Sequence, residues 1–165
     1  MDEKTFSRNF MKAWAERTGN IYYHKNADVP MSWMGDQKHV KIPRAVDYFA
    51  CIDGQFWAIE WKYHNSNRAF PVNGVRDKQI ETLQAVEKTR GRGVIIIAHY
   101  IKGSPALYVM TVNDWIDAAR MAMGADRLSI PLSEISQYRH ESQRDGNRIV
   151  WDYNKIFGIE LPLTV

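Results

Sequence analysis

The chain is 165 residues long, with 45% hydrophobic residues, 25% charged residues and a formal net charge of +3. These values fit one globular domain and exclude disordered and collagen-like chains. No apolar run approaches the roughly 20 residues that a membrane-spanning helix needs, and the charged start MDEKTFSRNF predicts no signal peptide. The single cysteine, Cys51, cannot build a disulfide framework or a cysteine-rich zinc site. We therefore expect a cytoplasmic protein in which residues 1–165 form one domain.

Helical and extended patterns alternate along the chain. Phe6, Phe10 and Trp14 recur at the spacing of one buried helix face, and Gly19 is expected to end that helix. In chain order we expect a helix around residues 6–17, strands at 20–24, 45–52 and 55–63, a helix at 77–90, strands at 94–98 and 107–112, and a helix capped by Asn113. The buried face of that last helix is expected to hold Trp115, Ile116, Ala119, Ala122 and Met123. The order α-β-β-β-α-β-β-α predicts an α/β fold.

Residues 25–43 form a long connection that contains Pro30, Gly35 and Pro43 and has no clear period. Unstructured connections of this length are uncommon in compact domains and tend to be functional. Residues 38–44 hold three fixed positive charges and no acid, and residues 24–92 carry eleven Lys or Arg against eight acids. We therefore expect a basic loop or arm here, suited to a polyanionic partner such as nucleic acid.

The hairpin predicts which side chains lie together. Asp53 and Gly54 as a two-residue turn pair positions whose numbers sum to 107, so Asp47 lies opposite Glu60. Period-two alternation then places Lys62 on the same face as this acid pair. The opposite face is expected to hold Val46, Tyr48, Ile52, Trp57, Ile59 and Trp61.

Two opposed carboxylates repel each other unless one binds a proton or a cation lies between them. Oxygen ligands favour a hard ion such as Mg²⁺, and an ammonium group beside it can stabilise negative charge on a phosphate in a transition state. Asp47, Glu60 and Lys62 therefore indicate metal-assisted phosphodiester hydrolysis. The alternative is a solvated sheet face with a cross-strand ion pair. The five histidines show no metal-ligand spacing.

The order of these motifs resembles the PD-(D/E)xK nucleases, and more narrowly the RecU-like Holliday junction resolvases and their phage relatives. The resemblance covers most of the chain. It rests on residues 43–47 (PRAVD), 60–62 (EWK), 70–72 (FPV), 79–83 (QIETL), 93–97 (GVIII) and 150–153 (VWDY), together with the helix-1 pattern and the strand at 22–25.

This resemblance implies a restriction-endonuclease-like core with a mixed central sheet flanked by helices, a homodimer, Mg²⁺ or Mn²⁺, and paired nicks in four-way DNA junctions. It implies metal binding by Asp47, Glu60 and the backbone carbonyl of Trp61. Lys62 becomes the catalytic lysine, and Gln79 a catalytic helix residue that reaches towards the water or phosphate.

One position departs from the family pattern. Ser7 stands where relatives usually have a glutamate on the first helix. Glu3, one turn earlier, could take its place as a metal ligand, and Glu16 is a weaker alternative.

The DNA-binding candidates are basic residues and one aromatic residue around the predicted site. They are Lys25, Trp33, Lys38, Lys41, Arg44, Arg68, Arg76 and Lys78. Two other functions stay open: a nuclease of this superfamily that acts on another DNA substrate, such as a flap or a restriction-type site, and a catalytically silent DNA-binding module. The resemblance implies action in the cytoplasm of a bacterial cell or a phage-infected host.

Overall fold

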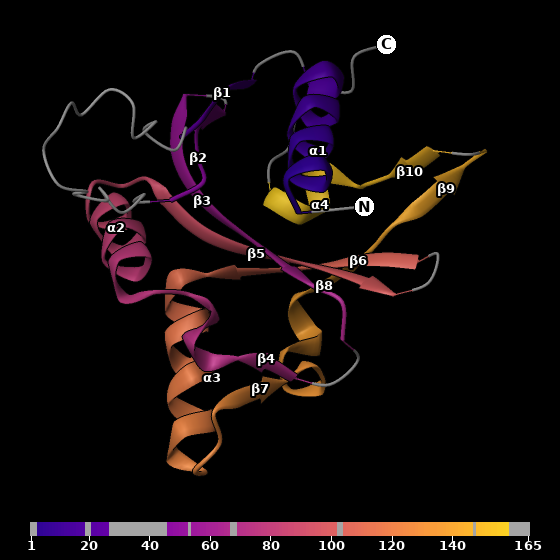
Figure 1. Cartoon of the computed structure of the whole chain (residues 1–165). Helices are drawn as coiled ribbons and strands as arrows, with labels where there is room; N and C mark the ends of the chain where they lie inside the picture. The colour runs from indigo at the N-terminus through magenta and orange to yellow at the C-terminus, as the bar shows by residue number, and fades with distance from the viewer. Residues whose placement is uncertain are drawn as a thin grey trace, which may run out of the picture.

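A six-stranded mixed sheet forms the centre of the computed structural model, which describes residues 3–18, 21–26, 46–52, 54–66, 69–101, 104–146 and 148–158 (Figure 1). Its strand order is β1-β2-β3-β5-β6-β8, and β3 and β5 are the parallel pair. The strands are β1 (Ile21–Lys25), β2 (Tyr48–Ile52), β3 (Gln55–His64), β5 (Arg92–Ile101), β6 (Ser104–Thr111) and β8 (Arg139–Glu141). The mixed sheet with flanking helices that we expected is therefore present.

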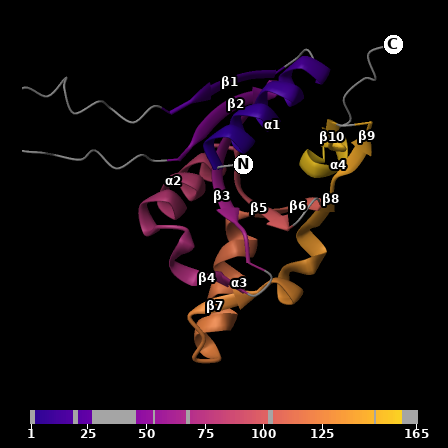
Figure 2. The same ribbon diagram turned by 45° about the vertical axis from the view of Figure 1, so that its right-hand side comes forward.

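Helices cover the two faces of this sheet. Helix α1 (Glu3–Thr18) and the short α4 (Tyr153–Phe157) lie on one face, and α2 (Asp77–Lys88) and α3 (Val112–Gly124) lie on the other (Figure 2). Two apolar cores result, one on each side. The smaller elements are β4 (Ala69–Pro71), η2 (Val72–Gly74), β7 (Ser129–Pro131), η3 (Leu132–Tyr138), β9 (Gln143–Asp145) and β10 (Arg148–Val150). None of the helices within the described ranges is long and apolar enough to cross a membrane.

The hairpin register matches the prediction. Ile52 pairs with Gln55 and Tyr48 with Ile59, so paired positions sum to 107. Gly54 has a φ of 76°, a left-handed conformation that glycine adopts without strain. Asp47 directly precedes the first residue of β2, so the predicted register carries it towards Glu60.

Three sequence expectations are wrong in detail. Val46 packs in the core beneath α2 and α3 rather than beneath α1, because β2 begins only at Tyr48 and strict alternation does not extend back to Val46. Helix α3 is capped by Thr111 rather than Asn113, since the Thr111 hydroxyl accepts the backbone N–H of Asp114. Met123 is 55% exposed at the end of α3.

Gly93 lets α2 approach the sheet closely. A Cβ atom at this position of β5 would lie 2.7 Å from the backbone oxygen of Leu83 in α2. Leu83 itself is completely buried against the sheet. A side chain at residue 93 would push the helix away, so Gly93 sets the distance of α2 from β5 and from its neighbour β3.

The predicted arm at residues 25–43 lies almost wholly outside the described residues. Only Lys25, the last residue of β1, and the following Asn26 are described. The predicted cap at Gly19 also falls outside them.

Candidate active site

Asp47 and Glu60 lie next to the last paired residues of β2 and β3, Tyr48 and Ile59. The Asp47 carboxylate oxygen Oδ2 accepts the backbone N–H of Trp61 at 2.9 Å. This bond ties the acid to the residue whose carbonyl was predicted as a metal ligand. The charge of Asp47 also raises the pKa of Glu60, so the two carboxylates lie within electrostatic range of each other.

Glu60 is the most buried polar side chain of this group, with 1% exposure. Its oxygen Oε1 accepts from the Lys62 ammonium at 2.6 Å and from the Gln79 amide at 2.5 Å. Its other oxygen, Oε2, is buried and has no hydrogen-bond partner among the described residues. Leaving a buried carboxylate oxygen without a partner is costly, so this atom is suited to a cation.

Gln79 connects the start of α2 to the two charged residues of β3. Its amide nitrogen donates to Glu60, and its carbonyl oxygen accepts from Lys62 Nζ at 3.3 Å and from the backbone N–H of Arg76 at 2.9 Å. Arg76 is the N-cap residue of α2, so this bond satisfies a backbone N–H at the start of the helix. Gln79 is therefore oriented by its own helix end, and it fixes Glu60 and Lys62 in turn.

Burial, and after it the negative charge of Asp47, raise the pKa of Glu60 to about 7, against the lowering effect of Lys62. The close Lys62 ion pair is thus not enough to restore an ordinary carboxyl pKa at this site. Because charge on Glu60 is unfavourable without a further cation, the metal-free site binds a proton near neutral pH.

We expect this proton to make the metal-free protein less stable as the pH rises. Between pH 4.5 and about 7 the folded chain holds a proton on Glu60 that the unfolded chain has lost. Stability therefore falls across this window, by roughly 3 kcal/mol for a pKa raised this far. Thermal unfolding in EDTA at pH 5 and pH 8 measures the effect, and Glu60→Gln should reduce the difference. An unchanged pH dependence in this variant would contradict the assignment.

The donor set fits Mg²⁺ better than a softer metal. Two carboxylates and one backbone carbonyl are all oxygen donors, and Mg²⁺ usually keeps several waters beside one or two protein carboxylates. No group of three His, Cys, Asp or Glu residues that could hold a metal occurs in the described ranges. The site therefore fits an ion that takes further ligands from water and phosphate rather than a closed structural metal.

Glu3 lies near the site, whereas Ser7 contributes to the core. The charge of Glu3 is among those that raise the pKa of Glu60. Ser7 is buried, and its hydroxyl lies 3.0 Å from the Tyr48 hydroxyl. Glu16 instead forms an exposed pair with Lys12 at 3.6 Å. Of the two acids that could replace the family glutamate, the electrostatics favour Glu3.

We expect Glu3→Gln to lower activity at limiting Mg²⁺ several-fold, because it removes a negative charge next to the metal ligands. Glu16→Gln is the matched control on the same helix and should leave activity unchanged. The measurement is the initial rate of DNA cleavage as Mg²⁺ is titrated. Equal effects from both variants would mean that the first helix supplies no ligand.

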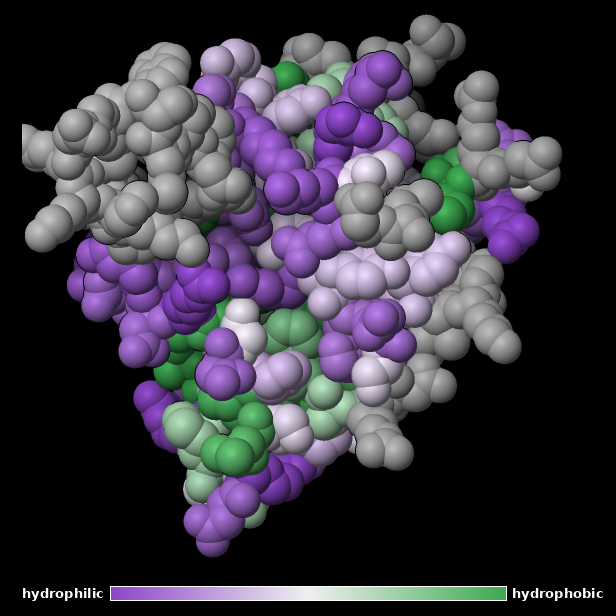
Figure 3. All heavy atoms as spheres, in the orientation of Figure 1, coloured by the Kyte–Doolittle hydropathy of each residue, from purple (hydrophilic) through white to green (hydrophobic). Residues whose placement is uncertain are grey.

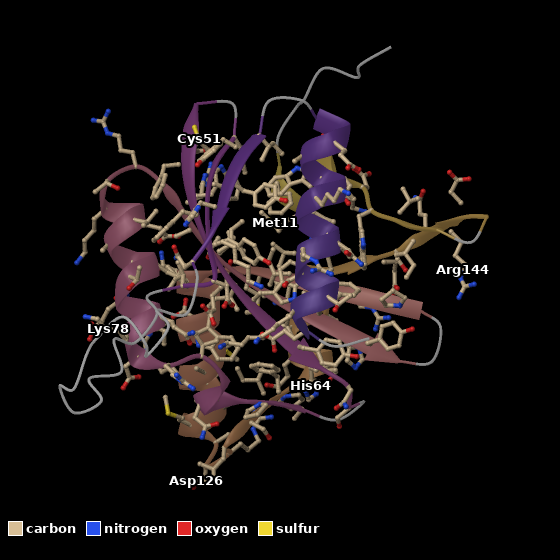
Figure 4. All side chains as sticks on the ribbon, turned by 45° about the horizontal axis from the view of Figure 1, so that its top comes forward. Met11, Cys51, His64, Lys78, Asp126 and Arg144 are labelled. Carbon is tan, nitrogen blue, oxygen red and sulfur yellow. The ribbon has the colours of Figure 1, made fainter. Side chains whose placement is uncertain are left out.

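Three of the predicted DNA-binding residues can be located. Lys25 is half-buried, with its ammonium 5.5 Å from the centre of the Tyr48 ring. Arg76 is exposed at the N-terminal end of α2, and Lys78 is exposed and paired with Glu81 at 3.1 Å. Lys78 points outward from α2 (Figure 4). The remaining candidates, Trp33, Lys38, Lys41, Arg44 and Arg68, lie outside the described residues.

Two histidines extend this face of β3 beyond Lys62. His64 and His99 are register partners on β3 and β5, and their rings stack with centroids 5.8 Å apart. Burial lowers the pKa of His64, and His99 Nε2 lies 2.9 Å from the Ser66 carbonyl oxygen. Because β3 and β5 are separated by a helix in sequence, the spacing of the histidines gave no sign of this pair. The histidine pair packs against the core through the His64 ring, whose centroid lies 5.4 Å from that of Phe70.

A groove lies to one side of these residues. It has a volume of about 910 Å³ and runs between η2, the N-terminal end of α2, and α3. The walls of the groove are largely apolar. Figure 3 shows an apolar patch in the lower part of the view. Arg76 borders the groove, but the acid pair and Lys62 do not line it.

Asp47 directly before β2, Glu60 and Lys62 on β3, and Gln79 on α2 have the arrangement that the sequence predicts for a nuclease of the PD-(D/E)xK class. The family model of Recombination protein U, RecU, matches residues 22–157. The chain therefore belongs to the RecU family of Holliday junction resolvases, and the family that we expected from the sequence is confirmed.

One solved structure and the curated sequences complete the comparison. The chain is similar to a Holliday junction resolvase, Hjc, from the archaeal hyperthermophile Archaeoglobus fulgidus, with 13% sequence identity and a TM-score of 0.45. The similarity covers 67% of this chain and 77% of that one. No curated protein sequence matches the chain.

Proposed function

We propose that this chain is a Mg²⁺-dependent, structure-selective endonuclease that resolves four-way DNA junctions by paired nicks. The observation that carries the proposal is the free buried oxygen of Glu60, held next to Asp47 and Lys62. A carboxylate that is fixed through one oxygen and unsatisfied at the other is prepared to bind a cation. Membership of the RecU family supports the DNA substrate.

Each site residue has a separate role in this proposal. Asp47, Glu60 and the Trp61 carbonyl hold Mg²⁺, for which Mn²⁺ can substitute. The ion supplies a Lewis acid for the scissile phosphate and lowers the pKa of a bound water. Lys62 places its ammonium where negative charge develops, and Gln79 keeps Lys62 and Glu60 in position.

The substrate requires two such sites. A four-way junction has two symmetry-related strands to cut, and a two-fold homodimer supplies two identical sites in the same relation. We propose that the basic arm at residues 25–43, with Trp33, Lys38 and Lys41, reaches the branch point. Lys25, Arg44, Arg68, Arg76 and Lys78 would contact phosphates, which fix position without reading bases.

We also propose that residues 1–165 form one nuclease domain that acts in the cytoplasm of a bacterial cell or a phage-infected host. The family match spans most of this range.

The test of the function compares DNA shapes. We expect the purified protein to cut a four-way junction in Mg²⁺ or Mn²⁺, at least tenfold faster than a linear duplex of the same sequence, and to be inactive in EDTA. Sedimentation should give the mass of a dimer. A monomer at working concentrations, or equal rates on junction and duplex, would favour a general nuclease of the same class instead.

A further inference from the structure

The sheet face that carries the acid pair continues into an exposed aromatic row at the other end of β2 and β3. Tyr22 pairs with Cys51, and Cys51 pairs with Phe56, so the three side chains stand in one line across β1, β2 and β3. Cys51 is four residues beyond Asp47, and Phe56 is four residues before Glu60. Period-two alternation therefore places the row on the face of the acid pair, about 13 Å from it at 3.3 Å per residue.

This row is open to solvent. Tyr22 is 73% exposed and Phe56 is 45% exposed, and Cys51 between them is also exposed. Phe49 extends the row inward, because its ring stacks on Phe56 with centroids 5.4 Å apart at 24°. Figure 4 shows Cys51 at the outer end of β2, on the open part of the sheet. Helix α2 packs mainly on β3 and β5.

Basic residues adjoin the aromatic row. The backbone of Gly91 lies against Phe56, since a Cβ atom at residue 91 would come within 3.0 Å of the Phe56 carbonyl oxygen. Exposed Lys88 and Arg90 lie beside this glycine at the end of α2. Neither of these two cations forms an ion pair with an acid of the described ranges at 4 Å or less. Arg92 is the register partner of Trp57, so alternation places it on the opposite face of the sheet.

Exposed aromatic rings next to exposed cations fit single-stranded DNA. Bases without a pairing partner stack on aromatic side chains, and the phosphates that link them attract Lys and Arg. A second copy of this chain fits less well. A two-fold interface would place the patch against itself and bring the two cations of one copy towards those of the other.

We propose that Tyr22, Phe49 and Phe56, with Lys88 and Arg90, form a binding surface for unpaired or unstacked DNA bases beside the cleavage site. The inference deepens the proposed function and rests on it for the substrate. The surface would hold nucleotides that leave the duplex near the branch point, while the phosphodiester to be cut lies at the acid pair. It would favour branched DNA over fully stacked duplex.

The test uses a fluorescent oligothymidine of twelve nucleotides, titrated with the full chain in EDTA. We expect Tyr22→Ala and Phe56→Ala each to weaken binding by about tenfold, within the range for loss of one base–aromatic stack. Tyr22→Phe keeps the ring and should bind like the wild type. Leu128→Ala, at an apolar residue that is 86% exposed after α3, is the matched control and should have no effect.

Salt dependence separates the two parts of the surface. Arg90→Gln should lower the slope of log affinity against log salt by about 0.7, while Tyr22→Ala should leave the slope unchanged. Tyr22 is the decisive position, because its strongly exposed side chain can be removed with little risk to folding. Wild-type affinity in Tyr22→Ala and Phe56→Ala would overturn the proposal. The proposal would also be overturned if these variants became monomeric while their affinity for oligothymidine stayed unchanged. That result would assign the surface to contact with a second copy of the chain.

Cleavage distinguishes this inference from the function on which it rests. If the wild type cuts four-way junctions and the aromatic variants bind oligothymidine normally, the surface is wrong and the nuclease stands. If the aromatic variants lose binding but the wild type cuts no DNA in Mg²⁺ or Mn²⁺, the surface stands and the nuclease is wrong.

Discussion

Asp47→Ala and Glu60→Ala should each reduce cleavage of a four-way junction on the order of a thousandfold or more, with junction affinity nearly unchanged. The two carboxylates are the acidic residues that hold the metal in the proposed site, and a metal contributes several kcal/mol to transition-state stabilisation. DNA affinity comes mainly from Lys and Arg contacts to phosphate, which neither change removes. Single-turnover cleavage in Mg²⁺, together with binding in EDTA, measures both quantities.

Glu81→Ala is the matched control, because Glu81 is an exposed acid on α2 that pairs with Lys78. It should cut at the wild-type rate. The isosteric changes Asp47→Asn and Glu60→Gln keep the shapes of the side chains and should be as inactive as the alanine variants. Near wild-type cleavage by any variant at position 47 or 60 would contradict the assignment of the site.

The position of the acid pair could be predicted from the sequence because a two-residue turn leaves one register. Asp53 and Gly54 set the sum of paired positions, and Ile52 opposite Gln55 follows from it. Alternation then places Lys62 beside Glu60, as the ion pair between them confirms. These are local rules, and they work within a single hairpin.

The contact between Gln79 and Glu60 could not be derived in this way. It depends on how closely α2 packs on β3. That distance is set in a third element, β5, where Gly93 lies against Leu83 of α2. The resemblance suggested Gln79, but it implied a water or phosphate as its partner. In the structure Gln79 instead holds Glu60 and Lys62.

The errors at Val46, Thr111 and Met123 have a common origin. Each lies at the end of an element, where the periodic pattern stops and local bonds or the edge of the core decide the orientation of the side chain. The Thr111 side chain accepts from the N–H three residues later, and Asn113 could have done so only if the helix began two residues further on. Periodicity alone does not choose between these starts.

Lys62→Met should lower cleavage by a factor of about 100 to 1,000, close to the loss from a missing electrostatic donor at a developing negative charge. The methionine side chain is of similar length, so the change removes the ammonium and leaves the packing nearly intact. Lys62→Arg keeps the charge but replaces a compact donor by a wide planar one, and the 2.6 Å contact with Glu60 leaves little room for it. We therefore expect partial activity at most in Lys62→Arg.

The pH dependence of Lys62→Met separates two roles of the lysine. Lys62 lowers the pKa of Glu60 against the effects of burial and of Asp47, so its loss should raise that pKa above 7 and weaken Mg²⁺ binding at neutral pH. Cleavage at pH 9 with saturating Mg²⁺ removes this difference, because Glu60 is then ionised in both proteins. If Lys62→Met regains the wild-type rate under these conditions, the lysine serves only to keep Glu60 charged. A deficit that persists at pH 9 places the ammonium at the transition state, since a charge needed only for metal binding would no longer limit the reaction.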